Sequence, residues 1–182
     1  LRVRSLNPME LSADATLPFA RDVVFRAYRD DLVACVEFLP NIRRIDVTSR
    51  KEEGGRTEIV SEWHGGGDIP AAARVVLSES MLSWTDHASW DESSWTCDWR
   101  IETHSFREAV DCRGKNRFVE VDGGTRLEIR GRLAIDASKV KGVPKLVSKS
   151  VSKTVEDFLV KKITPNLLSV SEGLRRYLEK KK

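Results

Sequence analysis

The sequence of 182 residues lacks the features that define several large protein classes. No uninterrupted apolar run approaches the roughly 20 residues that a membrane-spanning helix needs. Three cysteines, an odd number without a C-x-x-C pair, do not form a disulfide framework, so we expect three reduced, mostly buried thiols in a cytoplasmic protein. With 40% hydrophobic and 32% charged residues, the chain is instead typical of a globular protein that can bury a core without disulfides or metal.

The motifs of metal sites and of nucleophilic catalysis are also absent from the sequence. The histidines His64, His87 and His104 are not spaced as metal ligands, and neither an H-E-x-x-H nor a G-x-S-x-G motif occurs. The run Gly65-Gly66-Gly67 lacks the Lys-Ser/Thr that completes a phosphate-binding loop. We therefore predict no metal and no cofactor, and we interpret the three glycines as a flexible loop.

Basic residues are concentrated at the C-terminal end of the chain. Residues 137–182 contain 12 Lys/Arg against four Asp/Glu, whereas the rest contains 19 against 24. Such a segment can contact anionic lipid head groups, and it can equally be the solvated face of a helix. No aromatic residues alternate with these lysines, which argues against nucleic-acid binding. Residues 1–8 carry no apolar stretch, so we expect an N-terminal extension without a secretory signal, followed by one domain at 9–182.

Alternating polar and apolar residues predict seven strands. The first covers residues 9–17, and we expect the others at 42–51, 56–64, 82–90, 95–103, 109–121 and 125–135. Turns at Glu53-Gly54-Gly55 and Asp122-Gly123-Gly124 are strong hairpin signals. In the strand at 42–51, strict alternation places Ser49 on the face of Ile45 and Val47. Apolar residues on one face and charged residues on the other are typical of an antiparallel sheet with one buried side.

Three helices are predicted around these strands. Pro18 opens the first, and a short second helix over Leu32–Leu39 ends at Pro40. The third is long, because apolar residues recur at helical spacing from Leu146 to Leu178, a length of roughly 50 Å if the helix is straight. Pro165 should kink or break this helix nearby.

The order strand–helix–helix–six strands–helix predicts an α+β fold. A one-sided sheet needs a cover, so we expect a curved seven-stranded antiparallel sheet wrapped around the long C-terminal helix, with an internal cavity between them. The segments PFARDVVFRAYRDDLVACVEFLP (Pro18–Pro40) and GGTRLEIRGRLAID (Gly123–Asp136), with Trp99 and the closing helix, resemble the START-like helix-grip (SRPBCC) superfamily. That superfamily includes birch-pollen-type allergens, lipid-transfer START domains and bacterial polyketide cyclases, and the resemblance covers residues 9–180.

The resemblance implies that a hydrophobic or amphipathic small molecule, lipid-like or polyketide-like, binds in the cavity. Five tryptophans within 37 residues favour an aromatic cavity wall, although tryptophans at these positions can equally fill a core. The predicted lining residues are Trp63, Trp84, Trp99, Ile101, Leu127, Ile129, Phe158 and Leu159.

Two neighbouring residues are candidates for acid–base chemistry. Asp86 shares strand parity with Trp84, Ala88 and Trp90, so its carboxyl is expected to face inward with a raised pKa, unless a bulge or strand end turns it toward water. His87, on the opposite face, is the second candidate.

The leading hypothesis is a cytoplasmic carrier or sensor of a hydrophobic small molecule, without enzymatic activity. Pro165 and the glycine loop would allow the cavity to open, and the basic C-terminal helix would favour peripheral contact with an anionic membrane. One alternative is a cyclase or dehydratase that uses Asp86 or His87 in the same cavity. The other is a protein-interaction module.

Overall fold

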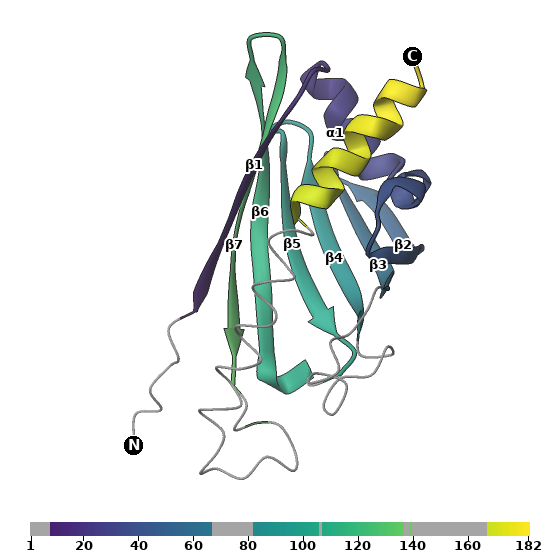
Figure 1. Cartoon of the computed structure of the whole chain (residues 1–182). Helices are drawn as coiled ribbons and strands as arrows, with labels where there is room; N and C mark the ends of the chain where they lie inside the picture. The colour runs from purple at the N-terminus through teal and green to yellow at the C-terminus, as the bar shows by residue number, and fades with distance from the viewer. Residues whose placement is uncertain (1–7, 67–81, 106, 137–138, 140–166) are drawn as a thin grey trace.

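The computed structural model describes residues 8–66, 82–105, 107–136, 139 and 167–182. Its elements are β1 (Met9–Leu17), α1 (Arg21–Asp30), η1 (Ala34–Phe38), β2 (Ile42–Glu53), β3 (Arg56–Gly65), β4 (Ser83–Asp91), β5 (Thr96–Thr103), η3 (Arg107–Ala109), β6 (Val110–Val121) and β7 (Gly124–Ile135). Residues 167–180 form the C-terminal helix. Figure 1 shows this helix beside α1, over the concave side of the sheet.

All seven strands lie in one antiparallel sheet with the order β1-β7-β6-β5-β4-β3-β2. The predicted strands and hairpins are confirmed. Glu53 pairs with Arg56 across the first two-residue turn, where Gly54 and Gly55 both have positive φ, 59° and 79°. A turn with two positive φ values matches the twist of a hairpin, and glycine adopts it without steric strain. The sequence of the turn therefore fixes the register of β2 against β3.

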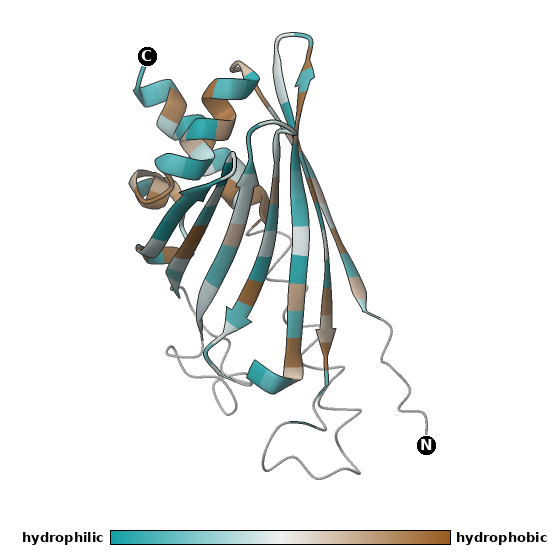
Figure 2. Cartoon of the chain, turned by 180° about the vertical axis from the view of Figure 1, so that it is seen from behind, coloured by the Kyte–Doolittle hydropathy of each residue, from teal (hydrophilic) through white to brown (hydrophobic). Residues whose placement is uncertain are grey.

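Side chains alternate between a buried concave face and an exposed convex face, and Figure 2 shows the resulting bands of hydrophilic and hydrophobic residues along the strands. The core lies on the concave face, where Leu127 and Leu133 of β7 are almost fully buried. From α1, Phe25 packs edge-to-face against Trp90 and Phe118, with ring centroids 5.3 and 5.1 Å apart. The aromatic contacts hold α1 against the sheet.

The register of β2 differs from strict alternation. Val47 pairs with Ser61 and Arg50 with Ile59, and a register shift lies between Val47 and Ser49. This β-bulge turns Ser49 away from the face of Val47, so the prediction that the two residues share a face was wrong. The bulge places Arg50 at the edge of the concave face instead.

Both short helices differ in their bounds from the prediction. The first, α1, begins at Arg21, three residues after Pro18. The second is a 3₁₀-helix that covers only Ala34–Phe38. The short apolar run over Leu32–Leu39 is long enough for little more than one turn, and Pro40 prevents its continuation.

The C-terminal helix packs against the α1–η1 corner. Leu174 and Leu178 are buried in the core, and a Cβ added at Gly173 would lie 2.6 Å from Cδ2 of Leu39. The part of the predicted long helix that contains Pro165 lies outside the described residues. No helix in the described ranges is long and apolar enough to span a membrane.

Candidate functional site

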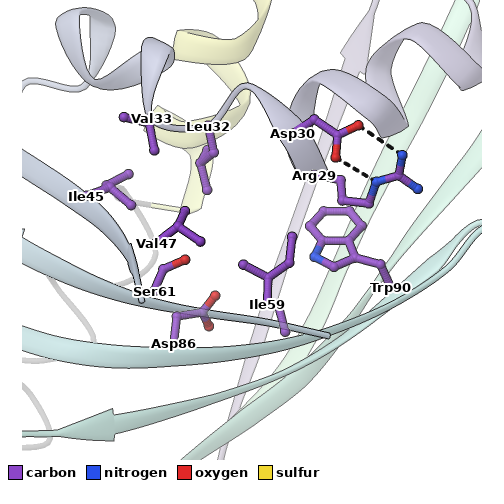
Figure 3. Close-up of a pocket in the computed structure, with 11 residues that line it drawn as sticks. Arg29, Asp30, Leu32, Val33, Ile45, Val47, Ile59, Ser61, Asp86 and Trp90 are labelled. Atoms are coloured by element: carbon purple, nitrogen blue, oxygen red, sulfur yellow. Dashed lines mark hydrogen bonds and ion pairs between the residues drawn. The ribbon is translucent and has the colours of Figure 1, made fainter. Parts of the chain in front are cut away.

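A pocket lies on the concave side of the sheet, between β2–β4 and the end of α1 (Figure 3). We call it the α1–sheet pocket. The pocket is small: the centre of a water-sized sphere can reach about 30 Å³ of it, within about 350 Å³ of empty space that includes open solvent. The sheet contributes Ile45, Val47, Ile59, Ser61, Asp86, Ala88 and Trp90, and the end of α1 with the following turn contributes Arg29, Asp30, Leu32 and Val33. Most of this lining is apolar, and the charged groups are few.

Asp86 is the acidic residue that the sheet places in this pocket. It lies in register with Ser61 of β3 and with Ile101 of β5, so its side chain shares the concave face with both. Figure 3 shows its carboxyl pointing from the sheet toward the α1 side, next to Ser61. Among the described residues, neither a hydrogen bond nor an ion pair reaches this carboxyl. Burial raises the pKa of Asp86 to about 7, although the side chain keeps some contact with water through the pocket.

The other two charged lining residues pair with each other. Arg29 Nε donates to Asp30 Oδ1 over 2.9 Å, and Arg50 Nη1 donates to the same oxygen over 2.9 Å. Arg29 Nη1 also donates to Glu92 Oε2 over 3.2 Å. Burial by itself would raise the pKa of Asp30, but the hydrogen bonds from Arg29 and Arg50 outweigh it and hold the pKa below its ordinary value. The rim of the pocket is therefore charged but internally neutralised.

A second group of polar atoms lies one residue pair further along the concave face. Trp63 pairs with Trp84 and Trp84 with Thr103, and the two indoles are stacked with centroids 5.6 Å apart. Trp63 Nε1 and Thr103 Oγ1 are buried without a hydrogen-bond partner in the described part of the chain. Buried polar groups are normally hydrogen-bonded, so these two donors and the Asp86 carboxyl are unusual features of this face.

Near β6, the polar side chains of Trp99 and Asn116 on the concave face are hydrogen-bonded to each other. Trp99 Nε1 donates to Asn116 Oδ1 over 2.9 Å. Burial raises the pKa of the Tyr28 hydroxyl well above its ordinary value. This part of the face is packed core, with Leu127 and Ile129 beside it.

Of the predicted lining residues, none of the six that the structure describes borders the α1–sheet pocket. Trp63 and Trp84 belong to a neighbouring apolar cluster, and Trp99, Ile101, Leu127 and Ile129 belong to the main core or pack against it. Phe158 and Leu159 lie outside the described residues. The structure therefore leaves these eight residues as a prediction for a cavity beneath the C-terminal helix. It adds Leu32, Val33 and Val47; periodicity placed Leu32 in a helix and Val47 on the face of Ile45, but it did not show that they border a pocket.

His87 lies on the convex face, away from the pocket. It is in register with Val60 and Arg100, and its Nε2 lies 3.8 Å from Glu102 Oε2. Glu102 also pairs with Arg100 and Arg107 on this face. Asp86 and His87 therefore do not act on the same ligand.

The described residues contain no cluster of His, Cys, Asp and Glu that could hold a metal ion. Cys35, Cys97 and Cys112 are free and buried. Burial raises the pKa of Cys35 and Cys112 to about 12, so these thiols stay protonated and are poor nucleophiles at neutral pH.

No protein-family model matches the sequence, and no curated protein matches it either. Solved structures do match. The chain is similar to TTHA0849 from Thermus thermophilus (TM-score 0.64, 17% identity, 92% of this chain and 95% of that one). It is also similar to the Zhui aromatase/cyclase from Streptomyces sp. R1128 (TM-score 0.61, 14% identity, 94% and 96%) and to ginseng major latex-like protein 151 from Panax ginseng (TM-score 0.58, 14% identity, 93% and 97%).

These similarities define the class of fold. The chain has the helix-grip fold, as the sequence predicts, and the match extends over nearly the whole length of each of these three neighbours. At sequence identities of 14–17%, these similarities establish the fold but not a shared activity.

Proposed function

We propose that this protein binds a hydrophobic or amphipathic small molecule on the concave face of its sheet and acts as a carrier or sensor in the cytoplasm. The observation that carries the proposal is the α1–sheet pocket, a mostly apolar recess with one carboxyl, that of Asp86, which has no partner among the described residues. Apolar surface transferred from water into such a recess stabilises a complex by roughly 25 cal/mol per Å². Structural neighbours with this fold include an aromatase/cyclase, which supports a role for the concave face in holding organic ligands.

Blocking the pocket tests this proposal. Val47 lines the pocket and is 51% exposed, so Val47→Trp fills the mouth without disturbing packed core. Val23, on α1, is similarly exposed at 41% and does not line the pocket, so Val23→Trp is the matched control. We expect the neutral dye Nile red to bind the unmodified protein and Val23→Trp alike, and Val47→Trp at least tenfold more weakly. Equal binding by all three proteins would contradict the proposal.

Native mass spectrometry of freshly purified protein provides a second test. A small-molecule mass that disappears on denaturation, and that is absent from Val47→Trp, identifies the chemical class of the natural ligand. A mass that persists in Val47→Trp would place the ligand elsewhere.

A cyclase or dehydratase in the same pocket is the second candidate, and Asp86 favours it. A carboxyl with a pKa of about 7 can both donate and accept a proton at neutral pH. The convex position of His87 leaves Asp86 as the acid–base residue of this hypothesis. Asp86→Asn should then abolish turnover while Nile red binding persists, whereas a carrier shows no turnover in either form.

Membrane contact through the basic C-terminal segment remains a prediction from the sequence. In the described helix, Lys180 pairs with Glu37, Lys181 with Asp31, and Arg175 with Glu172. Lys180 and Lys181 therefore reach the α1–η1 corner but stay more than half exposed, and Arg175 pairs within its own helix. Co-sedimentation with vesicles containing phosphatidylserine, against vesicles of phosphatidylcholine alone, tests the prediction.

A further inference from the structure

The positive and negative charges of the residues that line the α1–sheet pocket do not cancel. Arg29 and Asp30 are joined by two hydrogen bonds and have further partners on the rim. Asp86 has no counter-ion among the described residues. When Asp86 is ionised, the pocket lining therefore carries one uncompensated negative charge in an apolar setting, which is an unfavourable arrangement unless something neutralises it.

We propose that the α1–sheet pocket selects ligands that carry a protonated amine beside an apolar body, with the amine as the counter-ion of Asp86. This inference rests on the proposed function and names its ligand class. Ser61, in register with Asp86, supplies a hydroxyl that can accept a second hydrogen bond from an ammonium group. Trp90 on the same wall offers an aromatic ring, the preferred neutral partner of a cation. An anionic ligand is disfavoured by the same carboxyl.

Among the described titratable groups around the pocket, Asp86 is the one expected to change its charge between pH 6 and pH 8. Across the pocket, α1 presents the Arg29–Asp30 pair, and Tyr28 lies within electrostatic reach. Cys97 of β5 and Cys112 of β6 are also within reach, and burial raises the pKa of both thiols. Ser61 and Ile101, which pair with Asp86 on β3 and β5, do not titrate. Tyr28 and the two thiols stay neutral between pH 6 and pH 8.

Three probes of one shape test the proposal: 2-naphthylmethylamine (cationic), 2-naphthylmethanol (neutral) and 2-naphthoate (anionic). Their dissociation constants are measured by isothermal titration calorimetry at pH 6 and pH 8. An amine that binds only ionised Asp86 gains affinity as the ionised fraction of Asp86 rises. Its preference over the alcohol should therefore grow about tenfold from pH 6 to pH 8. The naphthoate should be the weakest ligand at pH 8.

Two variants assign the effect to one carboxyl. Asp86→Asn should lose both the preference for the amine over the alcohol and the pH dependence of that preference. Asp30→Asn removes the other lining carboxylate, which already pairs with arginines, and should keep the pH dependence. Circular dichroism verifies that both variants are folded, and the comparison of amine with alcohol on the unmodified protein needs neither of them.

The outcomes separate this inference from the proposed function. Equal binding of amine and alcohol at both pH values would overturn the inference and leave a hydrophobic pocket in place. A preference for the alcohol at pH 8, where most Asp86 is ionised, would also overturn it, because the pocket would then favour a neutral ligand over a cation beside the charged carboxylate. Binding by none of the three probes would overturn the proposed function of this pocket as well.

Discussion

The indole of Trp99 lies against the backbone of Gly131, two strands away on the concave face. A Cβ built on Gly131 would come within 2.7 Å of Trp99 Cη2 and within 2.8 Å of the Arg113 carbonyl oxygen. Gly114 lies between them in the sheet, paired with both Trp99 and Gly131. Two glycines therefore make the flat surface on which a tryptophan can lie while its Nε1 reaches Asn116.

Gly131→Ala should destabilise the protein by about 1–3 kcal/mol, because the added methyl group overpacks the indole and the neighbouring carbonyl. Urea unfolding followed by far-UV circular dichroism measures the change. In a Trp99→Phe background, the smaller ring leaves more room, so the same substitution should be less destabilising. An equal effect in the two backgrounds would show that Trp99 and Gly131 are not coupled.

Asp86 should make the stability of the protein fall as pH rises from about 4 to 7. Its pKa is raised to about 7 by burial in the folded state, against 3.8 ordinarily, so the folded protein binds more protons than the unfolded chain in this range. Below this range both states are protonated and the effect disappears. Between pH 5 and pH 8, the free energy of unfolding of Asp86→Asn should therefore gain about 2–3 kcal/mol relative to the unmodified protein. Urea unfolding at the two pH values measures it, and an unchanged difference would contradict a raised pKa.

Most of the fold could be predicted from the sequence because each strand alternates cleanly and the hairpin turns carry glycines. The inward position of Asp86 followed from the same parity. The bulge after Val47 could not be predicted, since inserting one residue changes the face of Ser49 without leaving a mark in an exposed, charged strand.

The site was harder to predict than the fold, for a physical reason. Periodicity identifies which residues face inward, but it does not show which of them meet another layer. Leu127 and Ile129 face inward and are buried in the main core. Val47 also faces inward, but it lies at the edge of the sheet and borders the pocket. That difference depends on where α1 ends over the sheet, and contacts between distant segments set that position.

Thr125 provides a test of how β7 holds the start of α1. It is fully buried, and its Oγ1 donates to the carbonyl oxygen of Phe19 over 2.8 Å. Thr125→Val keeps the shape but leaves that buried carbonyl without its partner, which should destabilise the protein by about 1–3 kcal/mol. Thr125→Ser keeps the hydroxyl and removes a methyl group, so it distinguishes the hydrogen bond from packing. If valine were tolerated better than serine in urea unfolding, packing and not the hydrogen bond would be the main contribution of this side chain.

The C-terminal helix should be held by its apolar side chains and not by its basic ones. Leu174 is fully buried, and its truncation to alanine should destabilise the protein by about 2–5 kcal/mol. Lys180 also contacts the α1–η1 corner, with Nζ 3.0 Å from Glu37 Oε1, but both side chains are more than half exposed. Exposed ion pairs contribute about 1 kcal/mol or less, so Lys180→Ala should change urea unfolding only slightly. A larger loss from Lys180→Ala than from Leu174→Ala would show instead that charge docks the helix, and high salt would then release it.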